Sequence, residues 1–329
     1  MTLQLDSREP EAGVPMSHVL SEADRTAVRE LAVELADPAG RIDDPLWVEE
    51  AREAASRLPS AVAAAVRRFR RDAGREGVLL LRGLPVDEAA LPPTPTVGGS
   101  VQHEPTVPAA SLVLTSMQLG EVVAFRQEKG GALVQNVVPV PGKEDFQGNA
   151  GSVRLKMHTE NAFHRNSPDY VILMCLRNDH DNVAGLLTSS VRCAVELLSA
   201  STREVLGQPR FVTSAPGSFE GAETPLPRPV LDGDPADPDI RVDFASTDPL
   251  DVTAASALDQ LRQAFDEVRR TFVLTPGDLA IVDNRIAVHG RTSFRPRYDG
   301  RDRWLQRTYV QLDARRSRPA RPGNGNVLN

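Results

Sequence analysis

The sequence predicts a mainly β protein with flanking helices, in which strands form a β-sandwich or jelly-roll core. Amphipathic helical patterns come first in the chain, and many short apolar runs bounded by glycine, proline or polar residues follow from about residue 131. One longer helical pattern, at residues 254–272, interrupts these runs. This order is typical of two packed sheets with helices on the outside.

The first third of the chain is predicted to be largely helical. Ser21 fits the N-cap of a first helix and Asp24 falls in its first turn. One or two further amphipathic helices are expected within residues 45–69. Residues 77–85 form a short apolar run between glycine and proline, which predicts a buried strand, and residues 109–125 predict a buried helix.

The remaining chain is predicted to be mostly strands, with one further helix at residues 191–207. The expected strands are 132–140, 169–176, 185–189, 211–213, 240–244, 279–282 and 304–312. Residues 215–238 are rich in proline, glycine and acidic residues and predict a long surface loop, a kind of segment that often acts as a lid.

The 329 residues are expected to form one domain, residues 21–314. Residues 1–20 are predicted to be disordered or loosely attached, and residues 315–329 to form a flexible tail. The oligomeric state is not indicated by the sequence.

Composition and charge exclude several classes of protein. The net charge of −7 argues against a general attraction to nucleic acid, and no apolar run reaches the roughly 20 residues of a membrane span. The N-terminus lacks the apolar stretch of a signal peptide. Cys175 and Cys193 lie in apolar segments outside any paired metal motif. We therefore expect a cytoplasmic protein with no membrane partner.

The most informative residues are His158, Glu160, His289 and Arg303. On an extended segment, positions i and i+2 point to one face, so His158 and Glu160 are expected to project together. His289 follows a strand and a turn that would bring it across the mouth of the barrel. Two imidazoles and one carboxylate suit a non-haem Fe(II) with open positions, and Arg303 suits a cosubstrate carboxylate.

Two other histidines compete as ligands. His164 lies four residues after Glu160, but that spacing requires a helix, and Pro168 with the β-rich run behind it argues against one. His180 lies in the polar, turn-like cluster RNDHDN and is expected to form a hydrogen bond within a loop.

At this point the chain resembles a known family. The segments are LRGLPVD, MHTENAFH, LRNDHDN and DNRIAVHGRTSFRPRYDGRDRWLQRTYV, within residues 77–312. They look like those of the clavaminate synthase-like iron(II)- and 2-oxoglutarate-dependent oxygenases, a group that includes arginine, asparagine and lysine hydroxylases of peptide-antibiotic pathways. The resemblance implies a double-stranded β-helix, or cupin-like jelly roll. It also implies His158, Glu160 and His289 as iron ligands, with 2-oxoglutarate and dioxygen as cosubstrates and Arg303 on the far carboxylate of 2-oxoglutarate.

The sequence departs from the family at one cosubstrate contact. Where clavaminate synthase has a threonine that helps to hold 2-oxoglutarate, this chain has Leu186. Thr188 lies two residues further on and shares its face, so it is a candidate replacement.

The resemblance also suggests substrate contacts. Arg307 matches an arginine that holds the substrate α-carboxylate, although a surface arginine is the alternative. Gln127 matches a glutamine at the amino-acid head group. Asp243 is a candidate partner for a cationic side chain, with an aspartate at the rim as its alternative. Glu220 and Glu223, in the expected lid, are weaker candidates.

These expectations predict hydroxylation of a free basic L-amino acid at C3 or C4 in specialised metabolism, with arginine preferred and lysine next. Desaturation or cyclisation at the same site, an asparagine-like substrate and a carrier-bound substrate are alternatives. A zinc hydrolase would leave Arg303 without a role and usually has an HExxH helix, which this sequence lacks. A non-catalytic jelly-roll binding protein would not need the ligand set.

Overall fold

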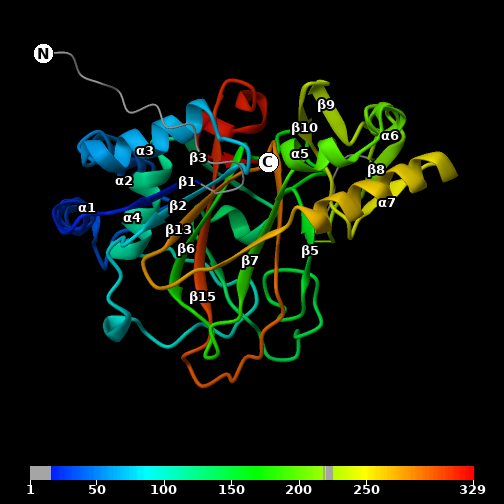
Figure 1. The fold of residues 1–329 in the computed structure, drawn as a ribbon. Helices are drawn as coiled ribbons and strands as arrows, with labels where there is room; N and C mark the ends of the chain where they lie inside the picture. Colours follow the sequence, from blue (N-terminus) through cyan, green and yellow to red (C-terminus); the bar gives the residue numbers. More distant parts are fainter. Residues whose placement is uncertain (1–15, 218, 220–224) are drawn as a thin grey trace, which may run out of the picture.

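The computed structural model describes residues 16–217, 219 and 225–329, and it places a β core between two groups of helices (Figure 1). The mainly β prediction with flanking helices is confirmed. The α-helices are α1 (Glu22–Leu35), α2 (Pro45–Ala55), α3 (Ser60–Arg71), α4 (Val107–Ser116), α5 (Val191–Ala194), α6 (Ala200–Leu206) and α7 (Val252–Glu267). The 3-10 turns are η1 (Glu88–Ala90), η2 (Lys129–Gly131), η3 (Val195–Leu197), η4 (Arg318–Ala320) and η5 (Pro322–Asn324).

The strands form two main sheets and two further pairs of strands. The larger sheet has the order β1-β2-β13-β6-β15-β3-β16, with β4 paired to β15, and the smaller has the order β12-β7-β14-β5. The larger sheet comprises β1 (Met16–Val19), β2 (Val78–Arg82), β13 (Leu279–Asp283), β6 (Tyr170–Arg177), β15 (Trp304–Gln311), β3 (Glu121–Phe125), β16 (Val327–Leu328) and β4 (Gln135–Val137). The smaller sheet comprises β12 (Arg270–Val273), β7 (Gly185–Ser190), β14 (Ala287–Arg291) and β5 (Leu155–His158). The two pairs are β9 (Leu231–Asp234) with β10 (Asp237–Ile240) and β8 (Phe211–Thr213) with β11 (Thr247–Pro249).

The core follows from the alternation of side chains along the strands. In β6, Ile172 and Met174 pack in a cluster that includes α1 to α4, whereas Leu173 and Cys175 pack in a second cluster. The second cluster takes its residues from both main sheets, so it fills the space between them. Because strand side chains alternate between faces, one fully buried strand serves both clusters.

The expected loose ends are partly ordered. Residues 16–19, within the N-terminal segment predicted to be loose, form β1 and pair in parallel with β2. In the expected tail, residues 327–328 form β16 and pair in parallel with β3. Both pairings form hydrogen bonds with backbone groups of β2 and β3 that would otherwise be unpaired at the two edges of the larger sheet. Residues 1–15 lie outside the described residues.

The helix predicted at 109–125 is wrong in its second half, because α4 ends at Ser116 and residues 121–125 form β3. The run is apolar nearly throughout, so it has no periodicity that separates a buried helix from a buried strand. Gly120 marks the change: a Cβ there would lie 2.4 Å from the Gln311 carbonyl oxygen of β15. The strand expected at 240–244 is also displaced, since β10 ends at Ile240.

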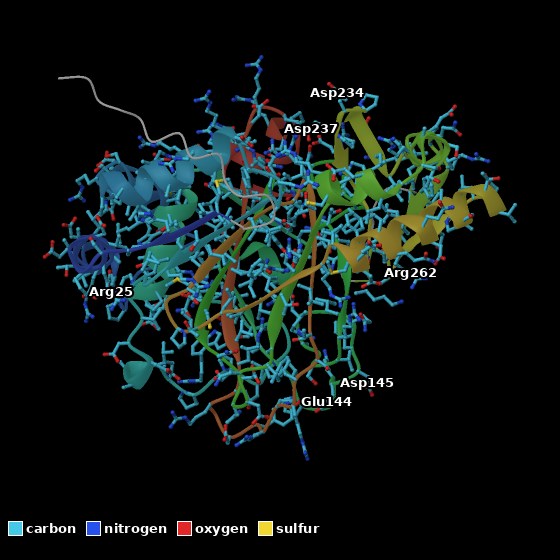
Figure 2. The ribbon with its side chains drawn as sticks, in the orientation of Figure 1. Arg25, Glu144, Asp145, Asp234, Asp237 and Arg262 are labelled. Carbon is cyan, nitrogen blue, oxygen red and sulfur yellow. The ribbon has the colours of Figure 1, made fainter. Side chains whose placement is uncertain are left out.

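The expected lid, residues 215–238, contains β9 and part of β10, and its role as a lid stays a prediction. Glu220 and Glu223 lie outside the described residues. Charged side chains such as Arg25, Glu144 and Arg262 lie at the periphery of the molecule (Figure 2). None of the helices in the described part of the chain has the length and apolar character that a membrane crossing requires.

We predict that Gly120→Ala lowers the free energy of unfolding by about 1–3 kcal/mol, because the new methyl group must displace backbone of β15. Urea denaturation measures this. Gly217→Ala is the matched control, since a Cβ at Gly217 meets nothing within 4 Å. Equal stability of the two variants would contradict the prediction.

Candidate active site

Strand β14 brings two of the expected ligands together. His289 pairs with His158 of β5 on one side and with Thr188 of β7 on the other. The centroids of the two imidazole rings are 4.4 Å apart. His289 therefore does not reach His158 across the mouth of a barrel, as the sequence suggested, but lies beside it in the same sheet.

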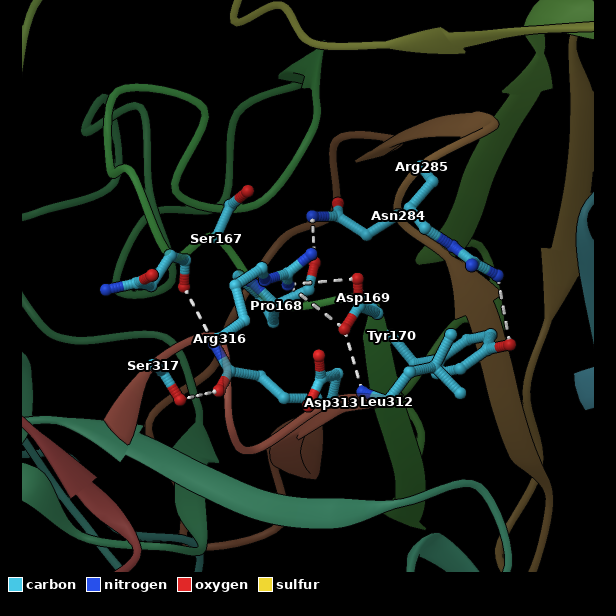
Figure 3. A network of polar contacts seen from close by, with 12 residues as sticks. Ser167, Pro168, Asp169, Tyr170, Asn284, Arg285, Leu312, Asp313, Arg316 and Ser317 are labelled. Carbon is cyan, nitrogen blue, oxygen red and sulfur yellow. Dashed lines mark hydrogen bonds and ion pairs between the residues drawn. The ribbon is translucent and has the colours of Figure 1, made fainter. Parts of the chain in front are cut away.

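Glu160 lies in a turn just beyond the end of β5 rather than on an extended strand, and Asn284 holds it there. The Glu160 backbone N–H donates to Asn284 Oδ1 at 2.7 Å. Asn284 Nδ2 donates in turn to the carbonyl oxygens of Glu160 at 3.1 Å and Pro168 at 2.9 Å, the latter shown in Figure 3. Sequence reasoning missed Asn284. Its position in a turn directly after a buried strand was the only available signal.

The three expected ligands can hold one metal ion. One ligand atom from each of His158, Glu160 and His289 lies within 4.8 Å of the others. His158 Nδ1 donates to the Lys156 carbonyl at 2.9 Å, which leaves Nε2 for a metal. Burial lowers the pKa of His289, so its neutral, coordinating form is favoured. The donor set thus fits Fe(II).

The other histidines are placed as expected. His164 is not part of this cluster and lies against a nearby pocket. His180 Nε2 forms a hydrogen bond with Asp299 Oδ2 at 3.0 Å, which confirms its predicted role in a loop. With Asp302, these two residues form a second group with metal-ligand chemistry among the described residues.

Arg307 is buried beside the expected metal ligands, so the surface alternative is wrong. Its Nη1 donates to Glu160 Oε2 at 3.0 Å, and its Nη2 donates to Glu128 and Gln135. Burial raises the pKa of the Glu160 carboxyl, but Arg307 and His289 outweigh this effect and hold the pKa well below its usual range. Glu128, which sequence reasoning missed, gives Arg307 a second carboxylate.

Arg303 is different, because none of the carboxylates in the described part of the chain pairs with it. Its side chain is buried, it forms no hydrogen bond or ion pair with the described residues, and its Nη1 has no partner. Its guanidinium lies 5.7 Å from the ring centroid of Phe294. Burial lowers the pKa of Arg303. A buried charge without a partner is costly, so this arrangement fits the far carboxylate of 2-oxoglutarate.

Thr188 and Leu186 lie on the same face of β7. Thr188 is buried opposite His289, whereas Leu186 packs in the apolar cluster between the sheets. Thr188 is thus placed near the metal ligands, and Leu186 offers no hydrogen bond.

A pocket of about 410 Å³ adjoins this region. Gln127 lines it, and Gln127 Oε1 is buried without a partner among the described residues. Ala162 and Phe163, which follow Glu160 closely in the chain, form part of its wall.

Asp243 is placed next to a metal ligand. It forms an isolated antiparallel bridge with His158. Its side chain is half-buried, which fits neither a fully buried carboxylate nor a fully exposed rim residue. Its two oxygens accept from Ala245 N and Ser246 Oγ, both at 2.8 Å.

The chain is similar to known proteins over most of its length. The model of the taurine catabolism dioxygenase TauD, TfdA family matches residues 49–309. An L-asparagine oxygenase of Streptomyces coelicolor is 54% identical over 94% of this chain and 93% of that protein. Clavaminate synthase 2 of Streptomyces clavuligerus is 37% identical over 81% of this chain and 84% of that protein.

Two solved structures extend this comparison. An asparagine oxygenase in complex with Fe(II), 2S,3S-3-hydroxyasparagine and succinate has a TM-score of 0.92 at 53% identity, covering 95% of this chain and 98% of that one. The non-haem iron oxygenase OrfP in complex with Fe, succinate and (3S)-hydroxy-L-Arg has a TM-score of 0.85 at 36% identity, covering 95% of this chain and 99% of that one.

We predict that Asn284→Ala weakens Fe(II) binding by about 10- to 100-fold, because Glu160 loses the side chain that fixes its backbone. Anaerobic titration against a competing chelator measures the affinity. Asn326→Ala is the control: it removes a comparable bond, from Asn326 Nδ2 to the Val122 carbonyl, and should leave the affinity unchanged. An equal loss of Fe(II) affinity in both variants would contradict the assigned role of Asn284.

Proposed function

We propose that this chain, which belongs to the taurine catabolism dioxygenase TauD, TfdA family, hydroxylates C3 of free L-asparagine. It is a non-haem iron(II)- and 2-oxoglutarate-dependent oxygenase, and its broader activity is the hydroxylation of an amino acid. With iron bound, such a site couples the conversion of 2-oxoglutarate and dioxygen to succinate and carbon dioxide with insertion of one oxygen atom into a C–H bond.

In this proposal, His158, Glu160 and His289 are the iron ligands and Arg303 binds the far carboxylate of 2-oxoglutarate. The unpaired, buried guanidinium of Arg303 supports its part. Thr188 is a further candidate contact for 2-oxoglutarate, since it lies opposite His289. These residues bind and orient the reactants, while the surrounding apolar cluster excludes water.

The amino-acid head would bind at Arg307, Glu128 and Gln127. Arg307 Nε is buried without a partner among the described residues, so it can donate to an α-carboxylate. The Glu128 carboxylate and the unpaired Gln127 Oε1 can both accept from an α-ammonium group. The three residues thus complement a zwitterion.

The observation that carries the choice of asparagine is the position of Asp243. Residues directly opposed in an antiparallel pair have Cα atoms about 4.5–5.5 Å apart, so the bridge to His158 keeps Asp243 close to the metal ligands. A carboxylate so close to an expected metal ligand suits a short substrate side chain that ends in a donor. The carboxamide of asparagine is such a group. The 54% identity to an L-asparagine oxygenase supports the same choice.

A basic amino acid is the second candidate, with arginine ahead of lysine as the sequence suggested. The similarity to OrfP, solved with (3S)-hydroxy-L-Arg, favours it, and Asp243 can pair with a cation. However, both Asp243 oxygens already accept a local hydrogen bond, which leaves less capacity for a bidentate guanidinium.

Three further expectations join the proposal. The two main sheets are proposed to form a double-stranded β-helix, since one apolar cluster fills the space between them. A cytoplasmic setting is proposed because Cys175 and Cys193 are free thiols. A place in specialised metabolism is proposed from the similarity to clavaminate synthase 2.

An assay with a substrate panel tests the proposal. The iron-loaded enzyme receives 2-oxoglutarate and free L-asparagine, L-aspartate, L-arginine or L-lysine, while succinate and product mass are measured. We expect L-asparagine to give the highest turnover and a gain of one oxygen. Preference for L-arginine would establish the second candidate, and loss of two hydrogens would identify desaturation. Turnover only with a carrier-bound amino acid would overturn the assignment of a free substrate.

We predict that Asp243→Asn lowers kcat/KM for L-asparagine by roughly 10- to 100-fold, because a charge-assisted hydrogen bond to the substrate amide is lost. Steady-state succinate formation measures kcat/KM. The affinity for 2-oxoglutarate should stay the same. Asp248→Asn, at an exposed position in β11, is the matched control and should leave both values as they are. An unaltered kcat/KM in Asp243→Asn would remove Asp243 from the substrate site.

A further inference from the structure

A second buried arginine lies beside Arg303. The Arg291 guanidinium is 5.3 Å from the centroid of the Phe294 ring, and the Arg303 guanidinium is 5.7 Å from the same point. Both side chains are about 4% exposed, and neither forms an ion pair with a carboxylate among the described residues. Two buried cations thus lie around one aromatic ring, and neither has a carboxylate in ion-pair contact within the described part of the chain.

The position of Arg291 in β14 sets it at a particular distance from the metal ligands. Arg291 is two residues after His289, so both side chains leave the same face of the strand. Two strand residues span about 6.6 Å. A five-carbon dicarboxylate that binds a metal next to His289 at one end is therefore long enough to reach the level of Arg291 with its other end.

The surroundings of Arg291 leave donors free. Its Nη2 donates to the Val153 carbonyl at 3.0 Å, but its Nε is buried without a partner among the described residues. On the neighbouring strand, the residue opposite is Leu186, which has no polar group. A buried guanidinium with a free donor, and with no carboxylate partner among the described residues, is suited to an incoming anion.

We propose that Arg291 is a second cationic ligand of the far carboxylate of 2-oxoglutarate, which it shares with Arg303. The inference rests on the proposed cosubstrate site and adds a residue to it. Arg303 comes from the segment before β15 and Arg291 from β14, so the carboxylate binds between the two main sheets. The pair selects 2-oxo acids that carry a second carboxylate, because a mono-acid leaves both cations unpaired.

A purely structural role for Arg291, in which it supports the backbone at Val153, makes a different prediction. Loss of that support would disturb every ligand of the site equally, whatever charge the ligand carries. A direct contact would be lost only for ligands that have the far carboxylate. Pairs of 2-oxo acids that share the chelating end and differ at the other end therefore separate the two roles.

The test is an anaerobic titration of the Fe(II)-loaded enzyme, followed by the visible charge-transfer band, with 2-oxoglutarate and with 2-oxovalerate. In Arg291→Met we expect the Kd for 2-oxoglutarate to rise roughly 10- to 100-fold, while the Kd for 2-oxovalerate stays the same. Arg291→Lys should recover part of the loss, because the charge remains. Unchanged 2-oxoglutarate binding, or equal weakening of both ligands, would overturn the proposal.

Controls keep this result separate from folding and from the proposed function. Arg321→Met is the matched variant, since Arg321 is also buried and donates to backbone carbonyls, and it should bind both 2-oxo acids normally. Fe(II) affinity and thermal stability without ligand report on the integrity of Arg291→Met and Arg291→Lys. If the unmodified enzyme fails to bind 2-oxoglutarate, the cosubstrate assignment itself is wrong. If the unmodified enzyme and Arg291→Met both bind 2-oxoglutarate normally, only Arg291 is removed from the cosubstrate site.

Discussion

The site depends on the register of β14 between β5 and β7. Its two pairings set His289 beside His158 on one side and Thr188 on the other. The pairing with β5 shifts register just after His289, so β5 has one extra residue there, and bulges of this kind are common next to active sites. Gly290 permits it, because a Cβ at that position would lie 2.6 Å from the Leu155 carbonyl oxygen. Gly290, between His289 and Arg291, thus allows β5 to approach β14 closely at this point.

Charged side chains are distributed unevenly around the candidate site. Arg307 is buried with two carboxylates, Glu160 and Glu128, whereas Arg303 and Arg291 have no carboxylate partner among the described residues. The charge of Arg307 is balanced within the chain, and Arg307 holds the Glu160 carboxylate in place. The charges of Arg303 and Arg291 are not balanced in this way, and one carboxylate of a dianionic cosubstrate would balance them. Ion pairs therefore lie beside the expected metal ligands, whereas Arg303 and Arg291, at the proposed site of the far carboxylate, are without a carboxylate partner among the described residues.

The sequence predicted the ligands and Arg303 because their chemistry depends on residue type within contiguous motifs. Asn284, Glu128 and Arg291 were not predictable in this way, since each acquires its role from tertiary contacts that no local spacing reports. The strand β3 was missed for a related reason: a continuous apolar run has no period, and its pairing with β15 decides its conformation. Residues 16–19 and 327–328 are ordered because they complete a sheet, which composition alone does not reveal.

The ion pair between Arg307 and Glu160 has a consequence for the order of assembly. In many small metal sites the ion supplies the charge that lets the ligands come together, so binding and folding are one event. Here the Glu160 carboxylate already has a cation from the chain itself, and Asn284 holds its backbone. The negative charge of Glu160 is therefore balanced within the chain, and folding of this part of the site needs no ion to balance it.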